Sequence, residues 1–175
     1  KKKGAKVVVI DSYKSRTAKE ADWHIEPKPG SDGALAVAII NYIIYNNLVD
    51  LEYVKNHTNG FNELKEHVKD KDCQWASKIT GINEDDIKKL AHEIGTIQPV
   101  GIRIGVALER HYGGGQTIRA VTCIPALTGA WKYVGGGITQ FPVWEHPYKF
   151  DVICRPDLIP KGTRVINALQ IGRAL

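Results

Sequence analysis

The chain has 175 residues, of which 43% are hydrophobic and 25% are charged. This composition excludes a disordered or fibrous protein, and the length can support one sizeable domain or two small α/β units. The net charge of +5 includes the lysines at positions 1–3 and is otherwise dispersed, so we expect no nucleic acid partner. The apolar run at residues 34–44 is too short for a membrane span and is interrupted by Asn41.

The cysteine and histidine residues form no local metal-binding motif. Cys73, Cys123 and Cys154 lie more than thirty positions apart, and the six histidines include no HxH or HxxxH pair. We therefore predict no metal site encoded within the chain. Because the chain begins with Lys and contains no Met, we expect it to be a piece of a longer protein.

The first predicted element is a strand over residues 5–11, "AKVVVID". Its continuous β-branched run is typical of a parallel strand that is buried on both faces. Ligands of open α/β sheets bind outside the carboxyl ends of strands, where Asp11 lies. Asp11 is therefore either a ribose or base contact or a simple strand-terminating acid.

The next stretch, "PKPGSDGAL" at residues 27–35, precedes a long apolar segment. Ser31 or Asp32 is expected to cap a buried helix that extends to about residue 47. Asp32 at the positive end of that helix can equally contact a ligand, and the local sequence leaves both roles open.

Amphipathic helices are predicted over residues 50–57, 62–70, 74–80 and 81–95. The last is the best capped, with Asn83 at its start and Gly95 just after its end. A break at residues 97–99 then leads into a second buried strand at residues 100–106.

A glycine triplet at residues 113–115 lies between this second strand and a helix that we expect to begin at about Gln116. The free N–H groups of such a helix start can receive an anion, and Arg110 and His111 precede the turn. Glycine-rich turns of this kind are common, so the motif does not specify a ligand. Pro125 is expected to kink or end the helix.

The order of these segments is more specific than any one of them. "GAKVVVID", "PGSDGALA", "IRIGVALERHYGGGQTIRAVTCIPALTGAW" and "INALQIGRAL" together resemble the central portion of the molybdopterin-guanine-dinucleotide oxidoreductases, the family often named for dimethyl sulfoxide reductase. It includes formate dehydrogenases, nitrate reductases and thiosulfate reductases. The resemblance covers nearly the whole chain and implies a fragment that is inactive by itself.

This resemblance implies an α/β fold with Rossmann-like parallel sheets flanked by helices. Residues 1–98 would be the later half of one cofactor-binding domain, and residues 99–175 part of a second, related one. It also implies two molybdopterin guanine dinucleotides that hold molybdenum or tungsten, an iron–sulfur cluster in a segment upstream, an electron-transfer subunit and a small-molecule substrate. The alternative is a standalone nucleotide-binding module without a redox metal.

The resemblance further implies a set of cofactor-binding residues. Asp32 corresponds to the acid of the family's Pro-Gly-Thr-Asp motif, and its carboxylate can accept from the N1–H and N2 amino group of guanine. Asp11 corresponds to the acid at the guanosine end, although the family's Asp-Pro-Arg is Asp-Ser-Tyr here. The complete predicted set is Asp11, Gly30, Ser31, Asp32, Gly105, Arg110, His111 and Gly114. Arg110 and His111 are also the candidates for catalytic residues, with a structural role as the alternative.

Overall fold

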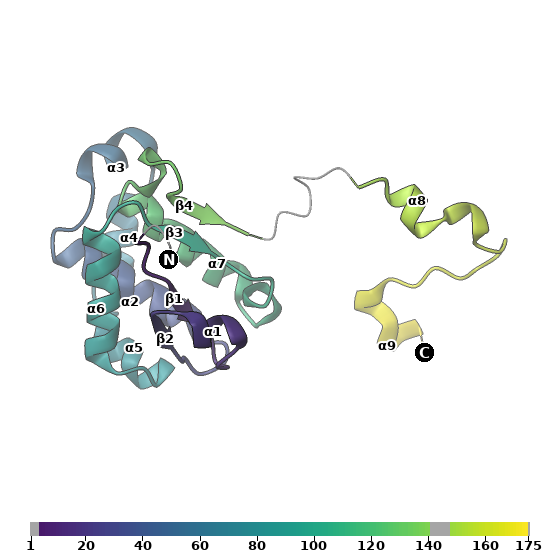
Figure 1. Cartoon of the computed structure of the whole chain (residues 1–175), viewed down its shortest axis with the longest axis horizontal. Coiled ribbons are helices and arrows are strands. Elements are labelled where there is room, and N and C mark those ends of the chain that lie inside the picture. Colours follow the sequence, from purple (N-terminus) through teal and green to yellow (C-terminus); the bar gives the residue numbers. More distant parts are fainter. Residues whose placement is uncertain (1–3, 141–147, 175) are drawn as a thin grey trace. The chain divides into compact units, whose positions relative to one another are not determined.

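The computed structural model describes residues 4–140 and 148–174. The chain divides into two compact units, residues 1–141 and residues 142–175. In chain order, the elements of the first unit are β1 (Val8–Ile10), α1 (Arg16–Glu20), β2 (Trp23–Ile25), α2 (Asp32–Tyr45), α3 (Leu51–His57), α4 (Phe61–Val68), α5 (Cys73–Thr80), α6 (Glu84–Thr96), β3 (Gly101–Arg103), η1 (Leu108–Arg110), α7 (Gly114–Leu127), η2 (Ala130–Lys132) and β4 (Gly137–Thr139) (Figure 1).

The strands form two separate parallel pairs. Strand β1 pairs with β2, with Val9 opposite His24, and β3 pairs with β4, with Ile102 opposite Ile138. The predicted α/β class with parallel strands and flanking helices is confirmed. The prediction that β1 is buried on both faces is wrong, because Ile10 is 40% exposed. Within the described residues β1 has a partner strand on one edge only, so its other edge stays open.

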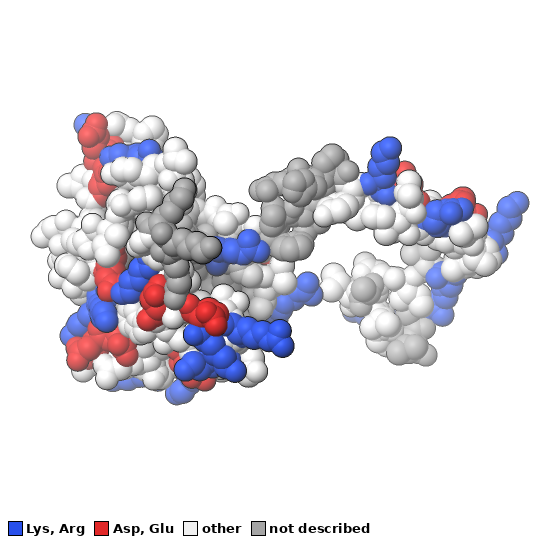
Figure 2. Space-filling view, in the orientation of Figure 1, with Lys and Arg blue, Asp and Glu red and all other residues white. Residues whose placement is uncertain are grey.

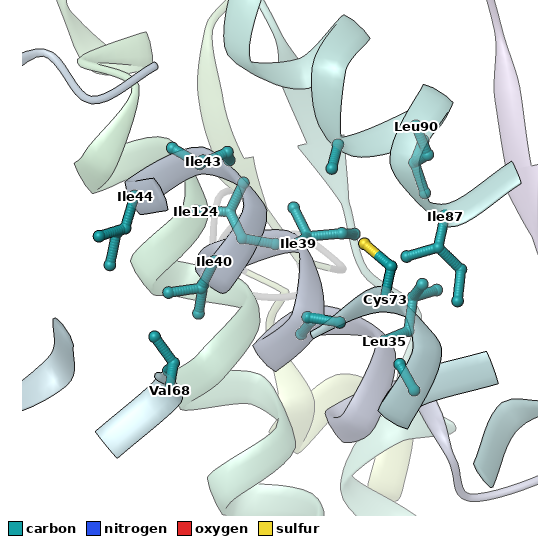
Figure 3. Close-up of a cluster of buried hydrophobic side chains, with 14 of the residues drawn as sticks. Leu35, Ile39, Ile40, Ile43, Ile44, Val68, Cys73, Ile87, Leu90 and Ile124 are labelled. Carbon is teal, nitrogen blue, oxygen red and sulfur yellow. The ribbon is translucent and has the colours of Figure 1, made fainter. Parts of the chain in front are cut away.

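Helix α2 lies at the centre of the core and packs against α4, α5, α6 and α7. Its near-continuous apolar sequence is buried on several sides, as the uniform hydrophobicity predicts. Ile40 and Ile43 are almost fully buried. Figure 3 shows side chains of α2 together with those that pack on it from α4, α5, α6 and α7, namely Val68, Cys73, Ile87, Leu90 and Ile124. Asn41, also buried, donates from Nδ2 to the Val68 carbonyl at 2.7 Å, so its amide is satisfied inside the core.

The helices predicted over residues 50–95 are confirmed, with one correction at a helix end. Asn83 caps α6 as expected, accepting from the Asp85 N–H at 2.8 Å. Gly95, by contrast, lies inside α6 rather than after it. A Cβ at this position would lie 2.7 Å from Leu48 Cδ1, so Gly95 allows close packing and does not end the helix.

The structure differs from two further local predictions. Helix α7 begins at Gly114 and continues through Pro125 to Leu127, so the proline does not end it. Ser31 occupies the N-cap position of α2, but its hydroxyl makes no capping bond and donates instead to the Lys28 carbonyl at 2.6 Å. That bond stabilises the turn before the helix.

Asp50 connects the start of α3 to the segment after α7. Its Oδ1 accepts from the Tyr53 N–H at 2.9 Å, and its Oδ2 pairs with Lys132 Nζ at 2.5 Å. The hydrogen bonds from Lys132 and Tyr53 hold the pKa of this carboxyl below its ordinary value. We expect Asp50→Ala to lower the free energy of unfolding by about 1 kcal/mol, mainly through loss of the helix cap. Asp50→Asn keeps a capping oxygen and should cost less. Urea denaturation of both variants measures the difference.

The lowered pKa of Asp50 predicts that the stability of the fold depends on pH. Because folding lowers the pKa of Asp50, its carboxylate stabilises the fold above the unfolded-state pKa of about 3.9, and this contribution is lost as the pH falls through the folded pKa. The stability difference between the wild type and Asp50→Ala should therefore shrink below about pH 4. A difference that stays constant down to about pH 2 would contradict the assignment.

The second unit contains α8 (Phe150–Cys154), η3 (Pro156–Leu158), η4 (Ala168–Gln170) and α9 (Ile171–Ala174). Arg155 between α8 and η3 has a positive φ of 46°, and its guanidinium binds the Asp157 carboxylate in a bidentate pair at 2.8 and 2.6 Å. Residues 101–139 belong to the first unit, where α7 packs on α2. The predicted division at residue 98 refers to domains of a longer enzyme and stays a prediction.

Candidate functional site

A cavity of about 410 Å³ lies at the carboxyl ends of β1 and β3. The end of β1, the turn before α2, the inner face of α2 and the segment from β3 to His111 all contribute to its lining, and α6 and α7 add apolar side chains. Of the predicted site residues, Asp11, Gly30, Asp32, Gly105 and His111 line this cavity. The fold thus brings together residues from three distant parts of the sequence.

Asp32 is the first residue of α2 and is half-buried. The turn before it is tight, since Gly30 has a φ of +79°, a conformation that glycine adopts most readily. No hydrogen bond from the described part of the chain reaches the Asp32 carboxylate. The positive end of the helix stabilises its negative charge, and the carboxylate remains available to a ligand with N–H donors.

Asp11 follows β1 and is exposed. Its Oδ1 accepts from the Tyr13 N–H at 3.1 Å, and its backbone oxygen lies 2.9 Å from His24 Nε2. One carboxylate oxygen therefore shapes the turn after the strand, which leaves the other for a contact at the cavity.

His111 and Gly30 lie side by side in the lining of the cavity. A Cβ built on Gly30 would lie 3.4 Å from His111 Nδ1, so the segment after η1 contacts the turn before α2. Gly105 lines the cavity, and a Cβ there would meet nothing within 4 Å. The space beside Gly105 is therefore open.

Three predicted residues do not line the cavity. Arg110 ends η1 and is exposed, and Ser31 is buried with its hydroxyl bonded to Lys28. Gly114 is buried at the start of α7, where a Cβ would lie 2.5 Å from the Leu108 carbonyl oxygen. Gly114 thus has a clear packing role, and its predicted cofactor contact, like that of Arg110, stays a prediction.

Sequence reasoning missed two cations at the site. Arg103, the last residue of β3, and Lys28, in the turn before α2, both line the cavity. The signal for Arg103 was a charged residue inside the apolar "GIRIG" stretch, and the structure places it at the carboxyl end of β3. Both residues therefore line the same cavity as Asp11 and Asp32.

The starts of α2 and α7 lie against each other. A Cβ on Gly33 would come within 2.8 Å of Thr117 Oγ1, so the first turns of both helices are in contact. The two positive helix ends therefore lie near one another. Elsewhere on the visible face of the first unit, acidic and basic side chains are interspersed (Figure 2).

The thiols in the first unit are poorly suited to ligation. Burial raises the pKa of Cys73 to about 11 and also raises that of Cys123, which disfavours the thiolate form that binds metals. Among residues 4–140 and 148–174, no group of three His, Cys, Asp or Glu side chains could hold a metal ion. Nor does any helix in these ranges have the length and apolar character needed to cross a membrane.

The family model for molybdopterin oxidoreductase matches residues 1–165. The chain belongs to the molybdopterin oxidoreductase family. It is 42% identical to the probable oxidoreductase YoaE of Bacillus subtilis, over 100% of this chain and 26% of that protein. It is also 36% identical to the F420-dependent formate dehydrogenase subunit alpha of Methanocaldococcus jannaschii, over 79% of this chain and 20% of the relative.

A solved structure agrees with the sequence matches. Acetylene hydratase from Pelobacter acetylenicus superimposes with a TM-score of 0.72 and 33% identity, covering 78% of this chain and 18% of the hydratase. The chain therefore spans about a quarter or less of the length of these relatives. The family implies a pterin cofactor that carries molybdenum or tungsten.

Proposed function

We propose that this chain is a cofactor-binding portion of a molybdenum or tungsten oxidoreductase and that its cavity holds one end of a molybdopterin guanine dinucleotide. The observation that carries the proposal is the gathering of Asp11, Asp32 and His111 around one cavity. That cavity lies at the carboxyl ends of β1 and β3, the strands that pair with β2 and β4. In open α/β sheets such a position is the usual ligand site.

The residues present fit the guanine end of the dinucleotide. Guanine presents two adjacent N–H donors, and the free carboxylate of Asp32 can accept from both. Gly30 has no side chain and a positive φ, so its backbone can approach a flat base closely. Asp11, at the end of β1, is placed to accept from a ribose hydroxyl.

The cations at the cavity fit the phosphates. Arg103 and Lys28 can neutralise a pyrophosphate, and Arg103 can bind it through two N–H groups. His111 lies beside Gly30 and is the better placed of the two candidate catalytic residues. We assign His111 a positioning role at the cofactor, and Arg110 remains a candidate for substrate or phosphate binding.

When bound, the cofactor supplies the two-electron redox or oxygen-atom transfer chemistry. The side chains of this portion then bind and orient the dinucleotide, and the apolar floor of the cavity excludes water from it. An iron–sulfur cluster in another segment and an electron-transfer subunit complete the proposed enzyme. The relative from M. jannaschii is itself named a subunit, which favours a multi-subunit assembly.

Metal and nucleotide analysis of the full-length protein tests this function. We expect the purified enzyme to contain molybdenum or tungsten by mass spectrometry and to release guanine nucleotide on acid treatment, with about two nucleotides per metal atom. Guanine nucleotide without either metal would favour the standalone nucleotide-binding module. A folded protein with neither component would contradict both readings.

A further inference from the structure

The backbone hydrogen bonds between β1 and β2 follow the parallel pattern as far as Asp11. Ile10, the last residue of β1, lies opposite Ile25. The next residue, Asp11, donates its N–H to the Ile25 carbonyl at 3.1 Å. In a parallel pair, a residue that donates to one position of the partner strand accepts from the position two residues further along. The Asp11 carbonyl is therefore expected to accept from the backbone N–H of residue 27.

Residue 27 is a proline and cannot supply that bond. Proline has no backbone N–H, and Pro27 is buried two residues after the end of β2. The chain then turns toward the end of α5, where the Lys28 N–H bonds to the Thr80 carbonyl at 2.8 Å. The backbone ladder between the two strands therefore ends one bond early, at the Asp11 carbonyl.

The imidazole of His24 replaces the missing donor. Its Nε2 lies 2.9 Å from the backbone oxygen of Asp11. Because a carbonyl oxygen can only accept, Nε2 carries the proton in this bond. His24 is the middle residue of β2 and lies three positions before Pro27. A side chain of β2 thus completes the ladder at the point where the backbone of the same segment cannot.

The bond from His24 affects the carboxylate of Asp11 through its backbone. The N–H and C=O groups of Asp11 are both held to β2, and its Oδ1 accepts from the Tyr13 N–H at 3.1 Å. These bonds fix the end of β1 and the turn after it, where Asp11 lines the cavity. Asp11 is exposed, so water could satisfy its carbonyl without fixing the turn, whereas a ring held in β2 does both.

We infer that His24 is a positioning residue of the cofactor site, which holds the Asp11 carboxylate in place through the Asp11 backbone oxygen. The inference rests on the proposed function, in which Asp11 accepts from a ribose hydroxyl. An acceptor that is fixed before the ligand arrives adds little ordering cost to binding. His24 does not itself line the cavity, so it acts through Asp11.

Four variants of the full-length protein test this role. His24→Ala removes the donor, and His24→Gln retains an amide N–H on a side chain of similar reach. Pro27→Ala restores a backbone N–H at the position that the parallel ladder requires. The double variant His24→Ala/Pro27→Ala has the restored donor and lacks the ring. If His24 serves the Asp11 carbonyl, His24→Gln should behave as the wild type, and His24→Ala should have less effect when Pro27→Ala is already present.

Hydrogen–deuterium exchange of protein produced without molybdenum and tungsten measures the link between His24 and Asp11. We expect the Asp11 amide to exchange about 5-fold faster in His24→Ala than in the wild type, the effect of losing one ordinary hydrogen bond. The control is the amide of Ile104, which bonds to the Thr139 carbonyl at 2.9 Å at the corresponding position after β3. Unchanged exchange at Asp11, equal acceleration at Ile104, or equal acceleration at Asp11 in His24→Gln would each overturn the inference.

Release of guanine nucleotide from the cofactor-loaded protein tests the consequence for the site. The dissociation rate should rise between about 2- and 5-fold in His24→Ala, because ordering of Asp11 then opposes binding. A wild-type release rate in His24→Ala, with the Asp11 amide accelerated, would show that His24 fixes the strand end but does not position a cofactor ligand, and would overturn the inference. Wild-type protein without guanine nucleotide would contradict the proposed function and the cofactor role of His24 with it. The exchange comparison needs no cofactor, so it would still decide whether His24 holds Asp11.

Discussion

Asp32→Ala in the full-length enzyme is expected to weaken binding of the guanine dinucleotide about 10- to 100-fold. The reason is the loss of charge-assisted hydrogen bonds to the guanine N–H donors, worth on the order of 1.5–3 kcal/mol. Guanine nucleotide and metal should both fall relative to protein, as measured by nucleotide release and elemental analysis. Normal content of both in a folded variant would count decisively against guanine recognition by Asp32.

Two control variants separate recognition from helix stability. Asp32→Asn keeps the shape of the side chain but replaces one acceptor with an N–H donor, so it should lose cofactor nearly as strongly as Asp32→Ala. Asp86→Ala removes an acid from the first turn of α6, away from the cavity, and should cost only about 0.3–1 kcal/mol of stability. If Asp86→Ala lowered cofactor content as much as Asp32→Ala, the loss would reflect general destabilisation.

Gly114→Ala is expected to lower the free energy of unfolding by about 1–3 kcal/mol through overpacking. The added Cβ would lie 2.5 Å from the Leu108 carbonyl oxygen and 2.8 Å from two Glu109 backbone atoms. These are backbone atoms of the segment around η1, so they cannot move aside as a flexible side chain would. Urea denaturation measures the loss.

Gly115→Ala is the matched control for this prediction. It lies in the same first turn of α7, where a Cβ meets nothing within 4 Å. The substitution should be neutral or stabilising by about 0.4–1 kcal/mol, since alanine restricts the unfolded chain. If both substitutions changed the free energy of unfolding equally, contact with the segment around η1 would not explain the effect of Gly114→Ala. A loss of cofactor in Gly114→Ala without loss of stability would instead support the predicted cofactor contact.

Much of the helical structure follows from local sequence. The apolar pattern of α2 and the cap at Asn83 place their helices within a few residues, because periodicity and capping act over one or two turns. Gly95 was misassigned because its role depends on Leu48, a residue of another segment. Strand burial was overestimated for a similar reason, since burial depends on which neighbours a strand acquires in the sheet.

The residues of the candidate site also divide into those that the sequence predicted and those that only the tertiary structure revealed. The order of motifs was enough to identify the family and to select Asp11, Gly30, Asp32, Gly105 and His111, all of which line one cavity. Arg103 and Lys28 were missed because single cations beside turns are common and become informative only when a cavity places them together. Ser31, Arg110 and Gly114 lie in the same segments but do not line the cavity. The Ser31 hydroxyl bonds to Lys28, and Gly114 packs against Leu108.

The sequence by itself therefore determined the family, the parallel α/β class and the segments that carry the site. Only the tertiary structure decided which members of those segments meet. The contact between the first turns of α2 and α7 and the placement of β1 and β3 on either side of one cavity join parts of the chain that are distant in sequence. Such contacts depend on how whole elements pack, and a local pattern of residues does not encode them.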